Sequence, residues 1–200
     1  MTIPVEREAA ETAQGDEEGA LLVAYANGDP DAGRDLALRL APRVLAQAVR
    51  MLGDRAEAED VTQEAMIRLW KVAPDWRQGE ARVTTWLYRV TANLCTDRLR
   101  RRRRAVPLEA VAEPEDDRPD VPDRMMGAAR QTALADALAE LPDRQAQAVA
   151  LRHLEGLANP EIAEIMDISV EAVESLTARG KRALAALLAH RKAELGYQDD

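Results

Sequence analysis

One predicted helix carries an aromatic, a cationic and an amide side chain on the same side. The residues of this face are Trp86, Arg89, Asn93 and Arg100. Their separations of three, four and seven residues are those of one helix face. An aromatic ring stacks on an unpaired base, an arginine binds phosphate, and an asparagine hydrogen-bonds to a base edge. The pattern predicts binding of single-stranded nucleic acid, and the alternative is a solvated face on which Trp86 seals the core.

The same predicted helix ends in a block of arginines. Six arginines occupy the seven positions 98–104. Blocks of like charge repel one another and are typical of interaction segments. The phosphate backbone is the polyanion that we expect as the partner. The alternative is a solvated helix end that the helix dipole favours.

A second predicted helix alternates in charge along one side. Its candidate residues are Asp60, Gln63, Glu64, Arg68 and Lys71, with Trp70 near the end of the helix. Alternating charge is typical of a solvated surface. Because a tryptophan on an exposed helix is a common interface anchor, this side is also a candidate protein-binding surface.

The most specific pattern lies in the C-terminal part of the chain. Residues 159–161, Asn-Pro-Glu, predict a helix cap, a first helical position and an acidic first turn. Asp167 and Ile168 then turn the chain, and Ser169 caps the following helix. Small Ala163 allows the two helices to approach closely. The segment predicts a helix-turn-helix, and an ordinary pair of packed helices is the alternative.

The second helix of this pair, from Val170, is the one that we expect in the major groove of DNA. Ser175 and Arg179 carry groups that suit base edges, and Lys181 and Arg182 suit phosphates. The full set of exposed candidates is Glu171, Ala172, Glu174, Ser175, Ala178, Arg179, Lys181 and Arg182. Gly180 costs the helix about 1 kcal/mol relative to alanine, and only close approach to a neighbour explains it.

The composition favours helices as the elements that position these faces. The chain is 46% hydrophobic, with 3% aromatic residues and no phenylalanine. Small aliphatic residues suit packed helices better than sheets. We therefore predict an all-α fold with two small helical domains joined by an acidic flexible linker, the second domain containing the helix-turn-helix.

The net charge of −9 is concentrated outside the predicted domains. Residues 1–18 contain six acidic residues and one basic residue, and residues 105–124 contain seven and two. Such segments do not build a core. The predicted organisation is a disordered acidic tail at 1–18, a helical domain at 19–104, a linker at 105–128, a helix-turn-helix domain at 129–192 and a tail at 193–200.

Several functional classes are disfavoured by what the sequence lacks. It contains no run of eighteen apolar residues, so we expect no membrane insertion. Its single cysteine, Cys95, fits a reducing cytoplasm and is expected to be a packed thiol. The two histidines have no metal-ligand spacing, and no phosphate loop or nucleophile elbow is present. We expect a cytoplasmic protein that is not an enzyme and that needs no metal or cofactor.

Several motifs in order along residues 20–190 resemble those of the extracytoplasmic-function (ECF, group 4) sigma factors of the sigma-70 family. These are promoter-recognition subunits of bacterial RNA polymerase. The motifs are residues 56–64, residues 85–90 with Asn93 and the arginine run, Leu141-Pro142, residues 155–157, and residues 161–165 with the helix that follows.

The resemblance implies three surfaces and their residues. It implies that residues 19–104 are sigma region 2 and residues 129–192 sigma region 4. The residues implied in docking on the β′ clamp of core RNA polymerase are Asp60, Gln63, Glu64, Arg68 and Trp70. The residues implied in opening the minus-ten element are Arg77, Arg82, Trp86, Arg89, Asn93, Arg98, Arg100 and Arg101. The helix from Val170, with the eight candidates named above, is implied in contacting the minus-thirty-five element.

The resemblance also implies partners. Core RNA polymerase, including its β and β′ subunits, and promoter DNA are expected, and so is an anti-sigma factor that holds the protein inactive. The alternative functions are a stand-alone helix-turn-helix regulator and an adaptor that uses the arginine run. The acidic total charge and the weakly basic recognition helix disfavour the stand-alone regulator.

Overall fold

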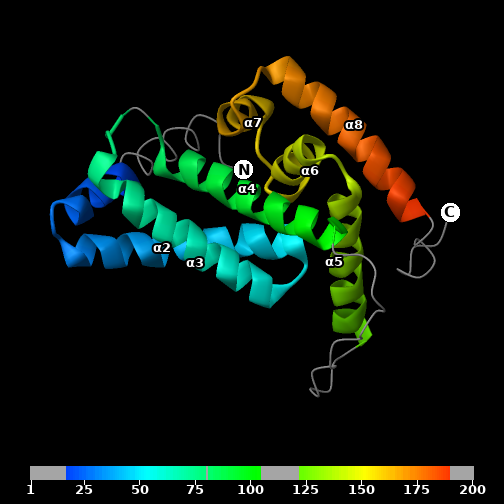
Figure 1. Ribbon diagram of the computed structural model, residues 1–200, viewed down its shortest axis with the longest axis horizontal. Coiled ribbons are helices and arrows are strands. Elements are labelled where there is room, and N and C mark those ends of the chain that lie inside the picture. Colours follow the sequence, from blue (N-terminus) through cyan, green and yellow to red (C-terminus); the bar gives the residue numbers. More distant parts are fainter. Residues whose placement is uncertain (1–16, 80, 105–121, 190–200) are drawn as a thin grey trace, which may run out of the picture.

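Helices joined by short turns make up the structure (Figure 1). The computed structural model describes residues 17–79, 81–104 and 122–189, and these ranges contain no strand. After a helical segment at residues 17–26, the elements are α2 (Pro30–Leu52), α3 (Arg55–Val72), the short 3-10 helix η1 (Ala73–Asp75), α4 (Val83–Arg104), α5 (Pro122–Glu140), α6 (Asp143–Val149), the π-helical turn η2 (Ala150–Leu154), α7 (Asn159–Met166) and α8 (Val170–Ala189). The predicted all-α fold is confirmed.

The first region, residues 17–104, is built from long helices separated by capped turns. Asp29 caps α2 by accepting hydrogen bonds from the backbone N–H groups of Asp31 and Ala32. Gly53 ends α2 with a φ of 66°, a conformation that glycine adopts without steric penalty. Asp54 then caps α3. Because these caps fix where α2 ends and α3 begins, they fix which side of α3 faces outward.

Apolar residues recur at helical spacing in three stripes of the sequence, at residues 36–52, 58–69 and 83–94, and this spacing predicts a buried face on each of three helices. These stripes form the core of the first region. The stripe residues that are buried are Leu36, Leu40, Val44, Met51, Leu52, Ala58, Val61, Ala65, Leu69, Val83, Leu87 and Leu94, whereas Val90 is only half-buried. Burial of these stripes removes apolar area from water, which is the main stabilising term in folding. The helical periodicity therefore predicted the packed faces of α2, α3 and α4 correctly.

The second region, residues 122–189, packs α8 against α5, α6 and α7. Gly180 lies where α8 crosses α6, and it is buried. A Cβ atom at this position would lie 2.6 Å from Cγ2 of Val149 and 3.1 Å from the carbonyl oxygen of Gln145. This close approach explains why glycine stands inside α8.

The two regions pack directly on each other. Helix α4 contacts α5, α6 and α7 of the second region as well as α2 and α3 of its own (Figure 1). One hydrophobic cluster includes Leu87 and Leu99 of α4 together with Leu138, Leu141 and Val149 of the second region. A second cluster, around Leu151 and Ile162, also receives Tyr88 of α4.

The element boundaries differ from the predicted domain boundaries at two places. Glu17 and Glu18, which we predicted to lie in the acidic tail, belong to the helix at residues 17–26. The buried Glu18 makes an ion pair of 3.0 Å with Arg43 of α2. Helix α5 begins at Pro122, so residues 122–128 are helical although we predicted a linker up to 128. The rest of the predicted acidic tail and linker lies outside the described residues, as does the predicted C-terminal tail.

Candidate nucleic-acid interface

The candidate face of α4 divides into an apolar end and a polar end. Trp86 is half-buried, packs on the core of the first region and meets Trp76 edge to face at a centroid distance of 6.4 Å. Arg89 and Asn93 lie one and two turns further along and are exposed. Trp86 therefore seals the core, as one interpretation predicted, and it is also partly accessible next to the polar side chains.

The polar end of this face contacts the second region. The Oδ1 atom of Asn93 accepts a hydrogen bond of 2.9 Å from Nε2 of Gln147 in α6. The Arg89 guanidinium donates to the carbonyl oxygens of Glu164 and Ile165 at the end of α7. These groups line a cavity of about 130 Å³ between α4, α6 and α7. The structure thus brings Arg89 and Asn93 together, and both side chains form hydrogen bonds with the second region of the chain.

The arginine run at the end of α4 makes more intramolecular contacts than its charge pattern indicated. Arg98 makes an ion pair of 3.5 Å with Asp60 of α3, and Arg100 makes ion pairs with Asp97 and Asp143. Arg101 is exposed.

Arg102, which the site prediction did not include, holds the end of α4 on the junction between α2 and α3. It donates to the carbonyl oxygen of Leu52 at 2.9 Å and makes an ion pair of 3.0 Å with Glu57. One residue of a block of arginines is thus a structural clamp. Nothing in a block of like residues could single it out in the sequence.

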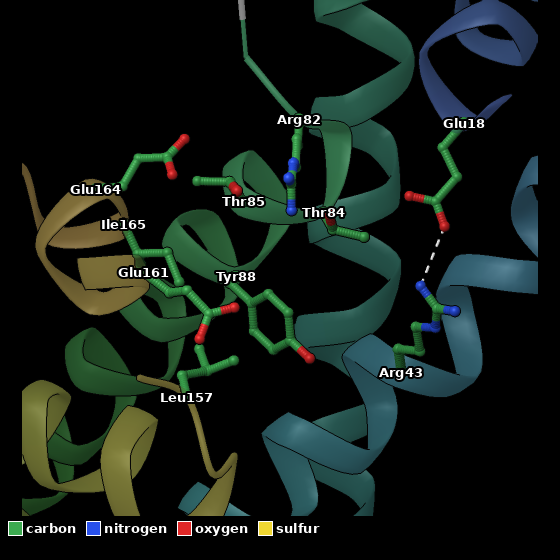
Figure 2. A pocket seen from close by; sticks show the side chains of 10 residues that line it. All are labelled: Glu18, Arg43, Arg82, Thr84, Thr85, Tyr88, Leu157, Glu161, Glu164 and Ile165. Atoms are coloured by element: carbon green, nitrogen blue, oxygen red, sulfur yellow. Dashed lines mark hydrogen bonds and ion pairs between the residues drawn. The ribbon is translucent and has the colours of Figure 1, made fainter. Parts of the chain in front are cut away.

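The loop before α4 lies beside a second cavity at the junction of the two regions. This cavity has a volume of about 230 Å³ and opens between α4 and α7. Figure 2 shows Arg82 pointing toward it, with Thr84, Thr85 and Tyr88 of α4 below and Glu161 and Glu164 of α7 on the opposite side. Arg77 and Arg82 are both exposed. Burial raises the pKa of the Tyr88 hydroxyl, with Glu155 adding to the effect.

The candidate protein-binding side of α3 is largely open. Asp60, Gln63 and Arg68 are exposed, and Glu64 pairs with Arg68 one turn along the helix. Trp70 differs from the expectation of an exposed anchor, because it is half-buried and its ring lies 4.7 Å from that of Tyr25.

Ile67 of α3 is 50% exposed and was not among the predicted residues. It lies between Gln63 and Lys71 on this side of the helix, at positions four residues apart. An apolar residue among charged ones was its only signal in the sequence.

The helix-turn-helix has the predicted turn and a different first cap. Asp167 has a φ of 54°, and Ser169 caps α8 by accepting a hydrogen bond from the Ala172 N–H. At the start of α7 the helix begins at Asn159, so Asn159 is not the cap as predicted. The Glu161 carboxylate reaches back and accepts a hydrogen bond of 2.7 Å from the Ala158 N–H. This is the contact that the third-position carboxylate of a capping box makes to the backbone N–H of the cap residue.

The outward side of α8 is open to solvent. Seven of its eight candidate residues are exposed, and Ala172 is half-buried. Asn159 donates to Glu174 at 3.4 Å, and Arg179 donates to the Ser175 carbonyl oxygen of the preceding turn. The pKa of Glu171 is lowered by hydrogen bonds from its own backbone N–H and from Ser169. None of these contacts ties α8 to the first region.

Two further sequence expectations concern Cys95 and membrane insertion. Cys95 is fully buried, and burial raises the pKa of its thiol to about 12, so the thiol is packed and unreactive. Among the described residues no helix has the length and apolar character needed to span a bilayer.

Comparison with known proteins places both regions in one family. Residues 36–105 match the family model of sigma-70 region 2, and residues 131–184 match that of sigma-70 region 4. The chain is 34% identical to the ECF RNA polymerase sigma factor SigE of Mycolicibacterium smegmatis, over 90% of this chain and 71% of that protein. It is 32% identical to the ECF RNA polymerase sigma factor SigW of Bacillus subtilis, over 78% of this chain and 89% of that protein.

Solved structures show the same fold. The structure of CnrH in complex with the cytosolic domain of CnrY superposes with a TM-score of 0.61 at 24% identity, covering 87% of this chain and 98% of CnrH. The sigma factor RpoE from Bartonella quintana was solved in complex with the anti-sigma factor NepR. It superposes with a TM-score of 0.54 at 21% identity, and the match covers 78% of this chain and 96% of that chain.

Two helical regions of this kind, in this order, define a sigma-70 type transcription initiation factor. The chain belongs to the ECF RNA polymerase sigma factors, and it is an alternative sigma factor. The comparisons lend no support to a stand-alone regulator.

Proposed function

We propose that the chain binds core RNA polymerase, contacts promoter DNA at two elements through its two helical regions, and opens the minus-ten element so that transcription begins. The observation that carries this division of labour is the pair of family matches, one on each region. The domains proposed are region 2 at residues 19–104 and region 4 at residues 129–192. In the structure, the first helical unit begins at residue 17 and the second at Pro122, a few residues before the proposed boundaries.

The polymerase contact is assigned to the outward side of α3. Asp60, Gln63 and Arg68 offer charged and hydrogen-bonding groups, and exposed Ile67 supplies an apolar centre. Binding energy at protein interfaces concentrates on such desolvated centres surrounded by polar groups. The β′ clamp is the proposed partner of this side. Trp70 supports it by packing on Tyr25.

The minus-ten contact is assigned to the polar face of α4 and the loop before it. A protein holds the edge of a base only after the base has left the stack. Arg89 and Asn93 offer phosphate and base-edge contacts, and partly exposed Trp86 offers a stacking surface. Other groups assigned here are Arg77, Arg82, Arg98, Arg100 and Arg101.

The minus-thirty-five contact is assigned to the outward side of α8. Ser175 and Arg179 suit base edges, and Lys181 and Arg182 suit phosphates. Glu174 has the acceptor oxygens that a cytosine amino group requires. The chain supplies no chemistry of its own in this proposal, since the polymerase makes the RNA. Its site of action is the cytoplasm, where core polymerase and promoter DNA are found.

An anti-sigma factor is part of the proposal. Two of the similar folds, CnrH and RpoE, were solved with a second protein bound, and NepR is an anti-sigma factor. A protein that occupies the outward side of α3 excludes core polymerase from it.

The test is reconstituted transcription. Core RNA polymerase is mixed with the purified chain and with a library of templates that have randomised promoter sequences. The templates that are transcribed are then identified from their RNA products. We expect co-elution with core polymerase and a defined start site on the selected templates. Failure to bind core polymerase, or transcription without start-site selection, contradicts the proposal.

A further inference from the structure

The aromatic ring that we propose to stack on an opened base rests against a second aromatic ring. Trp86 meets Trp76 edge to face, with ring centroids 6.4 Å apart and ring planes at 87°. Trp76 directly follows η1, at the start of the loop that leads to α4. Both rings are half-buried and pack on the core of the first region. Because edge-to-face contact is a preferred geometry of aromatic pairs, Trp76 limits the orientations that the Trp86 ring adopts.

The indole of Trp76 is held by packing and not by a hydrogen bond. Its backbone N–H donates to the Ala73 carbonyl oxygen at 3.1 Å, which fixes the main chain at the end of η1. In the part of the chain that the structure describes, the buried indole Nε1 has no hydrogen-bond acceptor. A buried donor without an acceptor costs free energy. The shape of the surrounding surface therefore determines where the ring lies.

The helix at residues 17–26 supplies the other side of this surface. Gly19 of that helix is buried. A Cβ atom at Gly19 would lie 3.5 Å from Cγ of Gln78 and 4.0 Å from Nε1 of Trp76. These are ordinary contact distances, so a single methyl group fits. Because Gly19 is buried, a longer side chain at this position displaces the indole or the Gln78 side chain.

The same helix is fixed firmly on the rest of the first region. Leu22 is fully buried in the hydrophobic core. The buried Glu18 makes its ion pair of 3.0 Å with Arg43 of α2. The helix lies before residues 36–105, which match the family model of region 2. A segment outside that match thus forms the support on which Trp76 rests.

We infer that Trp76 is a positioning residue of the minus-ten contact: held against the helix at residues 17–26, it fixes the Trp86 ring in the orientation that stacks on an opened base. This inference rests on the proposed function, in which Trp86 supplies the stacking surface. Trp76 acts through Trp86 and contacts no DNA itself. A ring that is fixed in advance loses less freedom when a base stacks on it, so binding is tighter.

The test measures how well the holoenzyme distinguishes an intact base from an abasic site. Forked templates are made from a promoter that the wild-type holoenzyme transcribes, each with one abasic site in the non-template strand of the minus-ten element. The Kd for the abasic template divided by the Kd for the intact template is the discrimination ratio. Trp86→Ala identifies the stacked base as the position where this ratio falls toward one.

We expect Trp76→Leu to lower the discrimination ratio at that position by about two- to tenfold, which is the contribution of one aromatic pair. Trp76→Phe keeps an aromatic edge and needs no acceptor, so it should keep the wild-type ratio. Gly19→Leu should lower the ratio as Trp76→Leu does, because it displaces the indole. Ala20→Leu is the matched control, since it adds the same side chain at an exposed position of the same helix. It should keep the wild-type ratio.

An unchanged ratio in Trp76→Leu overturns the inference, even where the affinity for both templates falls, because an equal loss indicates only a structural role. If circular dichroism shows that Trp76→Leu is unfolded, Gly19→Leu decides by the same ratio. If Trp86→Ala keeps the wild-type ratio at every position, the stacking role of Trp86 in the proposed function is refuted, and the inference falls with it.

Discussion

The two proposed DNA-binding helices present the same kinds of side chain in opposite states. On α4, Arg89 and Asn93 are bonded to α6 and α7. On α8, Ser175 and Arg179 face solvent, and the hydrogen bond between them lies within the helix. All four residues are exposed, so the difference lies in their hydrogen-bond partners: an exposed candidate residue can already be bonded to another part of the chain.

The largest expected effect tests whether the closed packing makes the two regions one unit. Leu69→Ala in the first region and Leu151→Ala in the second each remove a fully buried side chain. Each should lower the free energy of unfolding by about 2–5 kcal/mol. Because one hydrophobic cluster contains residues of both regions, calorimetry should show one transition for both variants. A separate early transition for Leu151→Ala would mean that the regions unfold independently.

The next effect concerns the face of α4 that carries Trp86 and Asn93, measured in the holoenzyme. Trp86→Ala combined with Asn93→Ala removes a stacking surface and a base contact, each worth about 1–3 kcal/mol. Open-complex formation on duplex promoter should fall by about 100-fold, measured by permanganate footprinting. Binding to core polymerase and transcription from a pre-melted template are the controls. Loss of core binding would mean that this face has only a structural role.

A smaller effect is expected on α8. Ser175→Ala combined with Arg179→Ala should reduce transcription from a promoter that has a minus-thirty-five element by about tenfold, in line with the loss of one good base contact. The same variant should transcribe a template lacking that element like wild type. An equal loss on both templates would show that α8 acts on stability and not on recognition.

The smallest effect separates the arginines of the run. Arg101→Ala combined with Arg104→Ala should reduce the slope of log affinity against log salt by about two, because two phosphate contacts are lost. Thermal stability should stay unchanged, since both residues are exposed. Arg102→Ala should instead lower the free energy of unfolding by about 1–2 kcal/mol, because Leu52 and Glu57 lose a charged donor. An unchanged salt slope would rule out phosphate binding by the exposed pair.

Much of the fold could be predicted from the sequence because its signals are local. Helical periodicity identified Leu36, Val61 and Leu87 as core residues, and the Asp167 turn with the Ser169 cap identified the helix-turn-helix. Each depends on residues within a few positions of one another. The family resemblance, confirmed by the comparisons, supplied the function.

The contacts between regions could not be predicted in the same way. Arg50 and Glu155 are 105 positions apart, and each looks like an ordinary surface charge in its own segment. The roles of Arg102 and Gly180 also depend on a distant neighbour, the α2–α3 junction for one and α6 for the other. A charge pattern in the sequence shows that a residue can bind a polyanion. It does not show whether another group of the same chain already pairs with that residue.

The most direct test of the central claim is the distance between the two regions before and after polymerase binds. Dyes at Asp35→Cys in α2 and Ala186→Cys in α8 report this distance by single-molecule energy transfer, and both positions are exposed. Cys95 stays in place, because its buried thiol does not react. We expect one high-transfer population in the free chain and a shift to low transfer when core polymerase is added. A free chain that already shows low transfer, or a high-transfer state that persists in the holoenzyme, would contradict it.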